Sequence, residues 1–203
     1  MSNPLNHIAI IDYGMGNLHS VSKALQHVGE NVKISVTADP TVINSADRVV
    51  FPGVGAIGDC MSEILRLDIG NILKNCIHHK PLLAICIGMQ ALLEHSEESG
   101  GVDCLKIVPG KVRQFDHRNT GASGDKIKVP HMGWNAVEQC ADHPLWNGIE
   151  QYSRFYFVHS YYAEAQGNTH TAAYCDYGVK FAAAMSYENL FAVQFHPEKS
   201  AKG

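Results

Sequence analysis

The stretch Pro81-Leu82-Leu83-Ala84-Ile85-Cys86-Ile87-Gly88-Met89-Gln90 decides the fold and the site that we expect in this chain. Its apolar run from Leu82 to Ile85 is typical of a buried strand, and the run stops at Cys86. Apolar residues recur at helical spacing from Met89, so a helix is predicted to begin where the strand ends. A strand that turns this sharply into a helix would hold Cys86 in a strained, exposed position at the sheet edge.

Small residues are needed two positions on either side of such a bend, because the two arms of the elbow nearly touch there. Gly88 meets this need fully and Ala84 nearly meets it. A cysteine at the end of an apolar strand is also a common buried hydrophobe. The stretch by itself therefore leaves Cys86 open to two interpretations, a nucleophile and a core residue.

Composition limits the class of protein. The 203 residues, 45% hydrophobic and 18% charged, predict one domain over residues 1–203 with a full core. A net charge of −4 and the lack of a basic run give no reason to expect nucleic acid as a partner. No apolar run approaches the ~18 residues of a membrane span, and the first residues lack signal-peptide features. Six widely spaced cysteines argue against a zinc site, so a cytoplasmic protein with reduced thiols is expected.

Strands and helices alternate in the first half of the chain. Strands are predicted at 7–12, 32–36, 48–51 and 82–85, with helices at about 18–28, at about 59–78 and after the elbow. This alternation predicts a parallel sheet with helices on both faces. The glycine-containing turn at 13–17 lacks the third glycine of a dinucleotide-binding turn, which favours a loop that faces substrate or a partner.

The pattern changes after residue 101, where strand-like runs follow each other closely. They lie at 105–108, 111–115, 126–129, 135–138, 155–158, 169–175, 181–187 and 190–195, with one short helical turn at 144–148. We therefore predict an α/β fold with an open mixed sheet, parallel in the N-terminal half and antiparallel-rich in the C-terminal half. Helices are expected on both faces of this sheet.

The last predicted strand leads into His196-Pro197-Glu198. A proline directly after His196 ends the strand, so the His196 ring is expected to be exposed at the strand end. Glu198 lies two residues on, within reach of an imidazole nitrogen. A surface histidine and glutamate beside a turn is the competing interpretation of this trio.

Together these segments supply a nucleophile, a base and an orienting acid in the order Cys86, His196, Glu198. A helix N-terminus and a neighbouring imidazolium both favour a thiolate over a thiol. The backbone N–H of Ile87, just after the nucleophile, points where a tetrahedral oxyanion would form. The glycine-rich loop Pro52–Gly55 can offer a second donor. These parts fit acyl transfer through a thioester.

Two segments, AICIGMQ at 84–90 and FHPE at 195–198, resemble the class I (triad) glutamine amidotransferases. Further segments are similar to the glutaminase subunits of imidazole glycerol phosphate synthases: DYGMGN at 12–17, PGVG at 52–55, PHMGWN at 130–135, YFVHSY at 156–161 and the pair Lys199-Ser200. The resemblance covers nearly the whole chain. The family usually has glycine where this chain has Ala84, and the extra methyl is expected to crowd the elbow slightly without removing function.

The resemblance implies that the chain hydrolyses L-glutamine to glutamate and ammonia. Cys86 would be the nucleophile, His196 the acid and base, and Glu198 the residue that orients His196. Oxyanion contacts would come from Gly53, Val54 and Ile87, and glutamine contacts from Gln90, Glu98, Ser160 and Tyr161. No cofactor and no metal is implied.

The resemblance also implies a heterodimer. Ammonia would pass, without release to solvent, to a (β/α)₈-barrel cyclase subunit that makes imidazole glycerol phosphate in histidine biosynthesis. The implied interface residues are Met15, Gly16, Asn17, Trp134 and Lys199, although Trp134 also fits a half-buried core aromatic. Because glycine peptide units reorient at little steric cost, the Pro52–Gly55 loop predicts low activity without the partner.

Three alternatives remain open. A paralogous glutaminase could feed ammonia to another acceptor, such as a surface-sugar pathway, because the partner selects the acceptor. A cysteine hydrolase of the α/β-hydrolase type would place its acid before the histidine, whereas Glu198 follows His196. A binding module without catalysis would keep Cys86 as a buried core residue.

Overall fold

The structure is a computed structural model that describes residues 6–121, 124–164 and 169–200. Its N-terminal half contributes four parallel strands in the spatial order β2-β1-β3-β4: β1 (Asn6–Ile11), β2 (Val32–Thr37), β3 (Arg48–Gly53) and β4 (Leu82–Cys86). A strand from the far end of the chain, β14 (Leu190–Val193), adds to β4 in parallel, with Val193 opposite Ile85. This register brings the carboxyl ends of β4 and β14 together, and these are the ends that lead to Cys86 and His196.

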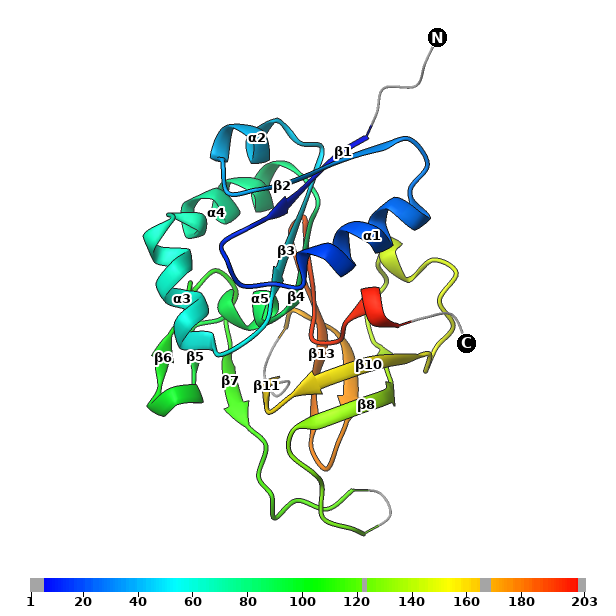
Figure 1. The fold of residues 1–203 in the computed structure, drawn as a ribbon. Coiled ribbons are helices and arrows are strands. Elements are labelled where there is room, and N and C mark those ends of the chain that lie inside the picture. The colour runs from blue at the N-terminus through cyan, green and yellow to red at the C-terminus, as the bar shows by residue number, and fades with distance from the viewer. Residues whose placement is uncertain (1–5, 122–123, 165–168, 201–203) are drawn as a thin grey trace.

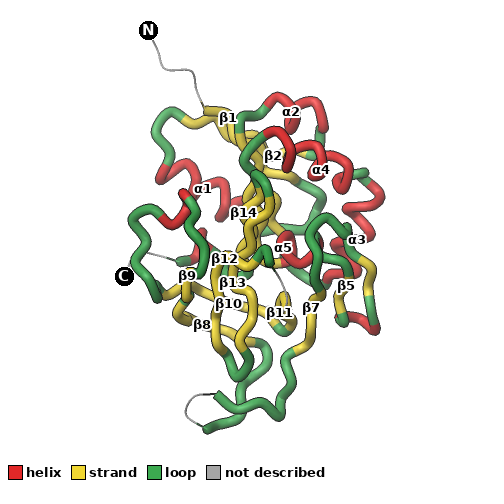
Figure 2. Tube along the Cα trace, turned by 180° about the vertical axis from the view of Figure 1, so that it is seen from behind, coloured by secondary structure: helices red, strands yellow, loops and turns green. Residues whose placement is uncertain are grey.

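Helices cover both sides of this parallel part. They are α1 (Leu18–Val28), α2 (Pro40–Ser45), α3 (Ile57–Arg66), α4 (Ile69–His79) and α5 (Ile87–Ala91). Figures 1 and 2 place α1 on one side of the sheet and α2, α3 and α4 on the other. The single helix predicted at 59–78 is two helices, because Asp68 adopts a left-handed φ of 54° between them.

The C-terminal half is mostly antiparallel, with parallel pairing only between β14 and β4 and between β5 and β7 among the described residues. The strand β13 (Lys180–Tyr187) pairs with β14 and continues the main sheet through β11 (Tyr161–Glu164), β7 (Lys111–Gln114), β5 (His95–Ser96) and β6 (Val102–Asp103). Off this path, β12 (Thr171–Asp176) pairs with β13 and with β9 (Glu138–Gln139). A separate antiparallel ribbon joins β8 (His131–Ala136) to β10 (Arg154–His159), seen below α1 in Figure 1. The predicted mixed α/β sheet is confirmed.

Short 3₁₀ turns complete the described chain, at η1 (Glu98–Gly100), η2 (Pro144–Trp146) and η3 (Pro197–Lys199). Two predicted strands are absent from the part of the chain that the structure describes. Over 105–108 the backbone N–H groups of Leu105, Ile107 and Val108 donate to carbonyls at the end of α5, and Lys126 forms only an isolated bridge to Thr120. The backbone groups at 105–108 are therefore satisfied by the end of α5 and not by a sheet ladder.

One apolar core runs through both halves of the sheet, with Phe51, Phe157 and Phe181 completely buried. Such continuity holds the parallel and antiparallel parts in a fixed relation, and the candidate site lies where they meet. Within the described ranges, every helix is too short or too polar to cross a bilayer.

Candidate active site

The bend at Cys86 has the strained geometry that the sequence predicts. Cys86 has φ 55° and ψ −113°, a combination that is uncommon outside glycine, and it directly precedes α5. The elbow is closed by Gly88, where a Cβ atom would overlap the carbonyl oxygen of Phe51. Ala84 is completely buried and pairs with Phe51 on β3, so its methyl is accommodated inside the sheet.

The expectation that the bend residue is exposed is wrong. Cys86 is only 4% exposed, and it lines a cavity of about 420 Å³. The antiparallel half of the fold, which a local strand-turn-helix pattern cannot reveal, forms the opposite wall through Val158 to Tyr161. The sulfur is therefore reached through a cavity and not from an open sheet edge.

Two hydrogen bonds hold the backbone of His196 next to this cavity. Its backbone N–H donates to the carbonyl of Tyr156 at 2.9 Å, and the Ser200 hydroxyl donates to the His196 carbonyl at 2.7 Å. The ring is 2% exposed, so the predicted exposed ring is wrong: the ribbon of β8 and β10 covers the strand end. The predicted contact with Glu198 is present, with His196 Nδ1 2.8 Å from Glu198 Oε1.

The electrostatics of this pair favour a protonated ring. Burial acts to lower the pKa of His196, but Cys86 and Glu198 together outweigh it and raise the pKa to about 9. An ionised carboxylate only accepts hydrogen bonds, so Nδ1 of His196 carries a proton. Its other nitrogen, Nε2, is buried and has no hydrogen-bond partner among the described residues. The ring thus has a proton to give on the side that Glu198 does not occupy.

The cavity brings together most of the residues that the sequence predicts for the site. The predicted residues in its lining are Val54, Cys86, Ile87, Gln90, Glu98, Ser160, Tyr161, His196 and Lys199. Gly53 lies outside this lining and pairs with Cys86 across β3 and β4. A Cβ atom at Gly53 would lie 2.8 Å from the backbone nitrogen of Gly88, so glycine lets the end of β3 approach the first turn of α5.

Two polar residues of the lining are held by contacts from distant parts of the chain. Glu98 Oε2 accepts from the backbone N–H of Ile57 at 3.1 Å and so caps helix α3. Gln90 is 1% exposed, and its Nε2 donates to the carbonyl of Tyr161 at 3.0 Å. The carbonyl oxygen of the Gln90 side chain is buried without a partner within the described residues. The cavity lining therefore includes a fixed carboxylate, and beside it a buried amide oxygen without a partner among the described residues.

The residues implied for the partner interface fall into two groups. Trp134 is 41% exposed and packs edge-on against the ring of Tyr156, over which Lys199 Nζ lies at 5.9 Å. The second group consists of Met15, Gly16 and Asn17, directly before α1. Met15 lies close to the Pro52–Gly55 loop, because a Cβ atom at Gly55 would lie 3.1 Å from Met15 Cε. Helix α1 also contacts η3, which carries Lys199, so the two groups are neighbours.

Sequence analysis missed three residues at this site. Gln194 is completely buried, and its Nε2 lies 3.7 Å from Cys86 Sγ. His159 lines the cavity and lies 3.0 Å from His131, and burial lowers the pKa of His159 to about 3 and of His131 to about 4. Tyr13 lies with its hydroxyl against Gly53. The available signal for Gln194 was a polar residue inside an apolar strand.

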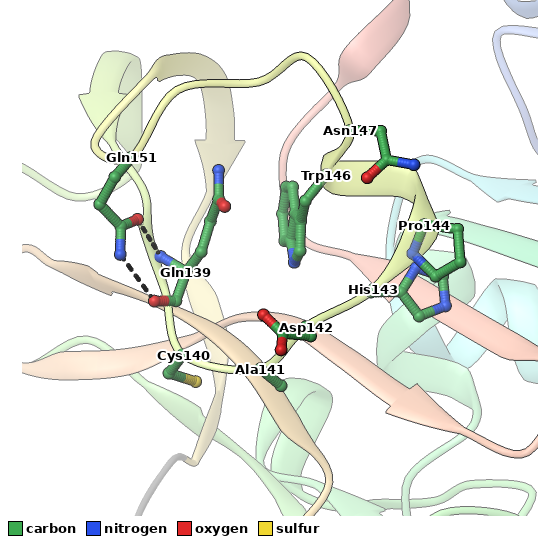
Figure 3. A pocket seen from close by; sticks show the side chains of 9 residues that line it. All are labelled: Gln139, Cys140, Ala141, Asp142, His143, Pro144, Trp146, Asn147 and Gln151. Atoms are coloured by element: carbon green, nitrogen blue, oxygen red, sulfur yellow. Dashed lines mark hydrogen bonds between the residues drawn. The ribbon is translucent and has the colours of Figure 1, made fainter.

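A larger cavity of about 760 Å³ lies elsewhere, under the loop from Gln139 to Gln151 (Figure 3). There the Gln139 backbone and the Gln151 side chain satisfy each other, with hydrogen bonds of 2.6 and 2.8 Å. It contains none of the residues predicted for catalysis. Nowhere in ranges 6–121, 124–164 and 169–200 do three His, Cys, Asp or Glu side chains gather as a metal site requires.

Comparisons with known proteins identify the family of this chain. The model of the family described as glutamine amidotransferase class-I matches residues 9–203. The chain is 58% identical over 193 residues to a Pseudomonas putida protein named imidazole glycerol phosphate synthase subunit HisH, covering 95% of this chain and 90% of that protein. A protein of the same name from Nitrosococcus oceani is 55% identical over 196 residues, covering 97% and 91%.

Solved structures show the same fold at low sequence identity. The structure of PurLQS from Thermotoga maritima superposes with a TM-score of 0.68 at 17% identity, covering 95% of this chain and 88% of that one. The glutaminase domain of CTPS from Trypanosoma brucei gives a TM-score of 0.62 at 15% identity, covering 97% and 87%. The chain belongs to the class I glutamine amidotransferase family, as its sequence predicts.

Proposed function

We propose that this chain is the glutaminase subunit of an imidazole glycerol phosphate synthase and that Cys86, His196 and Glu198 are its catalytic triad. The observation that carries the triad is the buried contact between His196 and Glu198, which lines up a proton-donating ring at the cavity that holds Cys86. The high identity to HisH proteins supports the choice of synthase. Residues 1–203 would act as one catalytic domain.

In the first half of the reaction, the Cys86 sulfur attacks the side-chain carbonyl carbon of glutamine. The carbonyl becomes an oxyanion, which backbone N–H groups at Ile87 and in the loop of Gly53 and Val54 would stabilise. His196 then gives its proton to the departing nitrogen, so ammonia leaves as the thioester forms. Glu198 keeps the ring oriented and stabilises its charge.

In the second half, neutral His196 removes a proton from water, and the resulting hydroxide attacks the thioester carbon. Collapse of the second oxyanion breaks the C–S bond, which releases glutamate and returns the thiolate beside the imidazolium. The cycle thus ends with the same thiolate and imidazolium pair with which it began, and no further group is needed. This balance fits a raised pKa for His196, because the resting pair holds its proton on the ring.

Glutamine itself would be recognised by its charged end. The Glu98 carboxylate suits the substrate ammonium group, and Gln90 lines the same cavity. Backbone and side-chain groups of Ser160 and Tyr161 form the opposite wall. Glu98 and Gln90 are both held by backbone groups from distant parts of the chain, so this part of the site is largely pre-formed.

The partner would be a (β/α)₈-barrel cyclase that receives ammonia through the surface around Trp134, Lys199 and Met15. Met132 adds to this surface, because the residue is 62% exposed. A cytoplasmic setting suits the chain, because all six cysteines are free and the mechanism needs a reduced thiol.

A glutaminase assay with and without the barrel cyclase and its ribonucleotide substrate tests the proposal. We expect low turnover by the chain alone, strong stimulation by the loaded cyclase, and no turnover by Cys86→Ala, which should still bind the cyclase. A lack of stimulation would point to a different ammonia acceptor. Full turnover by Cys86→Ala, or no adduct at Cys86 with a glutamine-like electrophile, would overturn the catalytic triad.

A further inference from the structure

A second polar side chain lies against the reactive sulfur. Gln194 is completely buried just beyond the end of β14, and its amide nitrogen lies 3.7 Å from Cys86 Sγ. Its backbone N–H donates to the carbonyl of Ala183 on β13 at 2.9 Å, which fixes where the side chain starts. Gln194 does not line the cavity, so it approaches the sulfur from the protein side and not from the substrate side.

The direction of the Gln194 amide follows from its neighbours. The backbone carbonyl of Tyr161 can only accept, so the group that Gln90 places 3.0 Å from it is the NH₂ end of the side chain. The same NH₂ lies 2.8 Å from the Gln194 side chain and must meet its oxygen. The NH₂ of Gln194 therefore points to Cys86.

The histidine pair holds the Tyr161 carbonyl from the other side. His159 Nδ1 lies 2.7 Å from this carbonyl and must donate to it, which leaves His159 Nε2 as an acceptor. His131 Nδ1, 3.0 Å away, then supplies the hydrogen, and its own Nε2 accepts from Asn135. Burial lowers the pKa of both rings and keeps them neutral, so this chain of hydrogen bonds has one direction only.

We propose that Gln194 is a further residue of the catalytic centre, whose amide N–H stabilises the Cys86 thiolate and holds it in the elbow. This inference rests on the proposed role of Cys86 as the nucleophile. His196 changes its charge during the cycle, because it gives its proton to the departing nitrogen and later takes one from water, whereas the Gln194 amide remains a donor at every stage. It is thus available when the C–S bond of the thioester breaks and the sulfur takes up the electron pair.

Gln194→Met tests this role, because methionine is close in size and cannot donate. The rate of Cys86 alkylation by iodoacetamide is measured against pH in the full chain. A hydrogen bond to a charged group changes an ionisation equilibrium by about tenfold, so we expect the pH midpoint of alkylation to rise by about one unit. Gln194→Glu, which places a carboxylate beside the sulfur, should raise the midpoint further.

The kinetic split separates this role from a structural one. With the cyclase bound, kcat for glutamine hydrolysis should fall about tenfold in Gln194→Met, while KM changes less than about twofold because Gln194 does not line the cavity. An unchanged alkylation midpoint in a folded Gln194→Met variant overturns the inference and leaves Gln194 as a buried structural residue.

A measurement on the unmodified protein covers the case in which the variants do not fold. The side-chain amide resonance of Gln194 should shift with the same pH midpoint as Cys86 alkylation, and this shift should vanish in Cys86→Ala. A resonance that ignores the titration of the sulfur overturns the inference, while labelled Cys86 and normal glutamine turnover would leave the proposed function intact. Failure of iodoacetamide to label Cys86 at all would remove both.

Discussion

Gly88→Ala is the sharpest test of the elbow. The new Cβ atom would overlap the carbonyl oxygen of Phe51 and lie 3.2 Å from its carbonyl carbon. Relief requires backbone movement, because Phe51 pairs with Ala84 inside the sheet. Overpacking typically destabilises by ~1–3 kcal/mol, and we take about 3 kcal/mol because the clash is with backbone. Better helix propensity offsets about 1 kcal/mol of this, which leaves a net loss of about 2 kcal/mol.

Thermal unfolding followed by circular dichroism measures this loss, and Gly58→Ala is the matched control. Gly58 is also helical, and its nearest neighbour to a new Cβ is Val102 Cγ2 at 3.9 Å. For a chain of this size we expect Tm to fall by about 4–8 °C in Gly88→Ala, and to stay equal or rise slightly in Gly58→Ala. Because Ile87 would move with the elbow, glutamine turnover with the cyclase should fall at least ~100-fold. Equal Tm and turnover in the two variants would refute this account of the elbow.

Three further predictions concern charge and the partner surface. Protonated His196 stabilises the fold fully below its ordinary pKa of 6.5, and this stabilisation is lost as pH rises through about 9. Glu198→Gln should lower the pKa of His196 and so move the alkaline limb of the kcat/KM profile to lower pH. An unmoved limb would contradict the assigned pair of His196 and Glu198. Glu98→Gln keeps an oxygen for the Ile57 N–H but loses the charge, so KM for glutamine should rise about 10- to 100-fold with little change in Tm; an unchanged KM would exclude Glu98 from recognition. Trp134→Ala should weaken cyclase binding in calorimetry while iodoacetamide labelling of Cys86 stays normal, and undiminished binding would place the interface elsewhere.

Most of the parallel half of the fold was predictable because β1, β3 and β4 are largely buried strands with apolar runs, whereas β2 is an edge strand without a buried residue. The strands β1, β2, β3 and β4 lie within a few residues of their predicted positions. The short strands β5 and β6 were missed because two residues carry no periodicity that distinguishes them from a loop, and β11 was missed as well. The break at Asp68 was missed for the opposite reason, since apolar residues such as Ile64 and Ile69 continue across it.

The sequence by itself determined the elbow, its cysteine and the order of the candidate triad, because each depends on residues that are neighbours along the chain. Glu198 follows His196 by two positions, and Gly88 follows Cys86 by two. Only the tertiary structure decided that the His196 ring is buried and that Gln194 faces the sulfur. The Gln194 contacts join residues 104 and 108 positions apart, to Gln90 and Cys86 respectively. The direction of these hydrogen bonds depends on the backbone carbonyl of Tyr161, which lies on β11. The local sequence around Gln194 therefore carries no information about that direction.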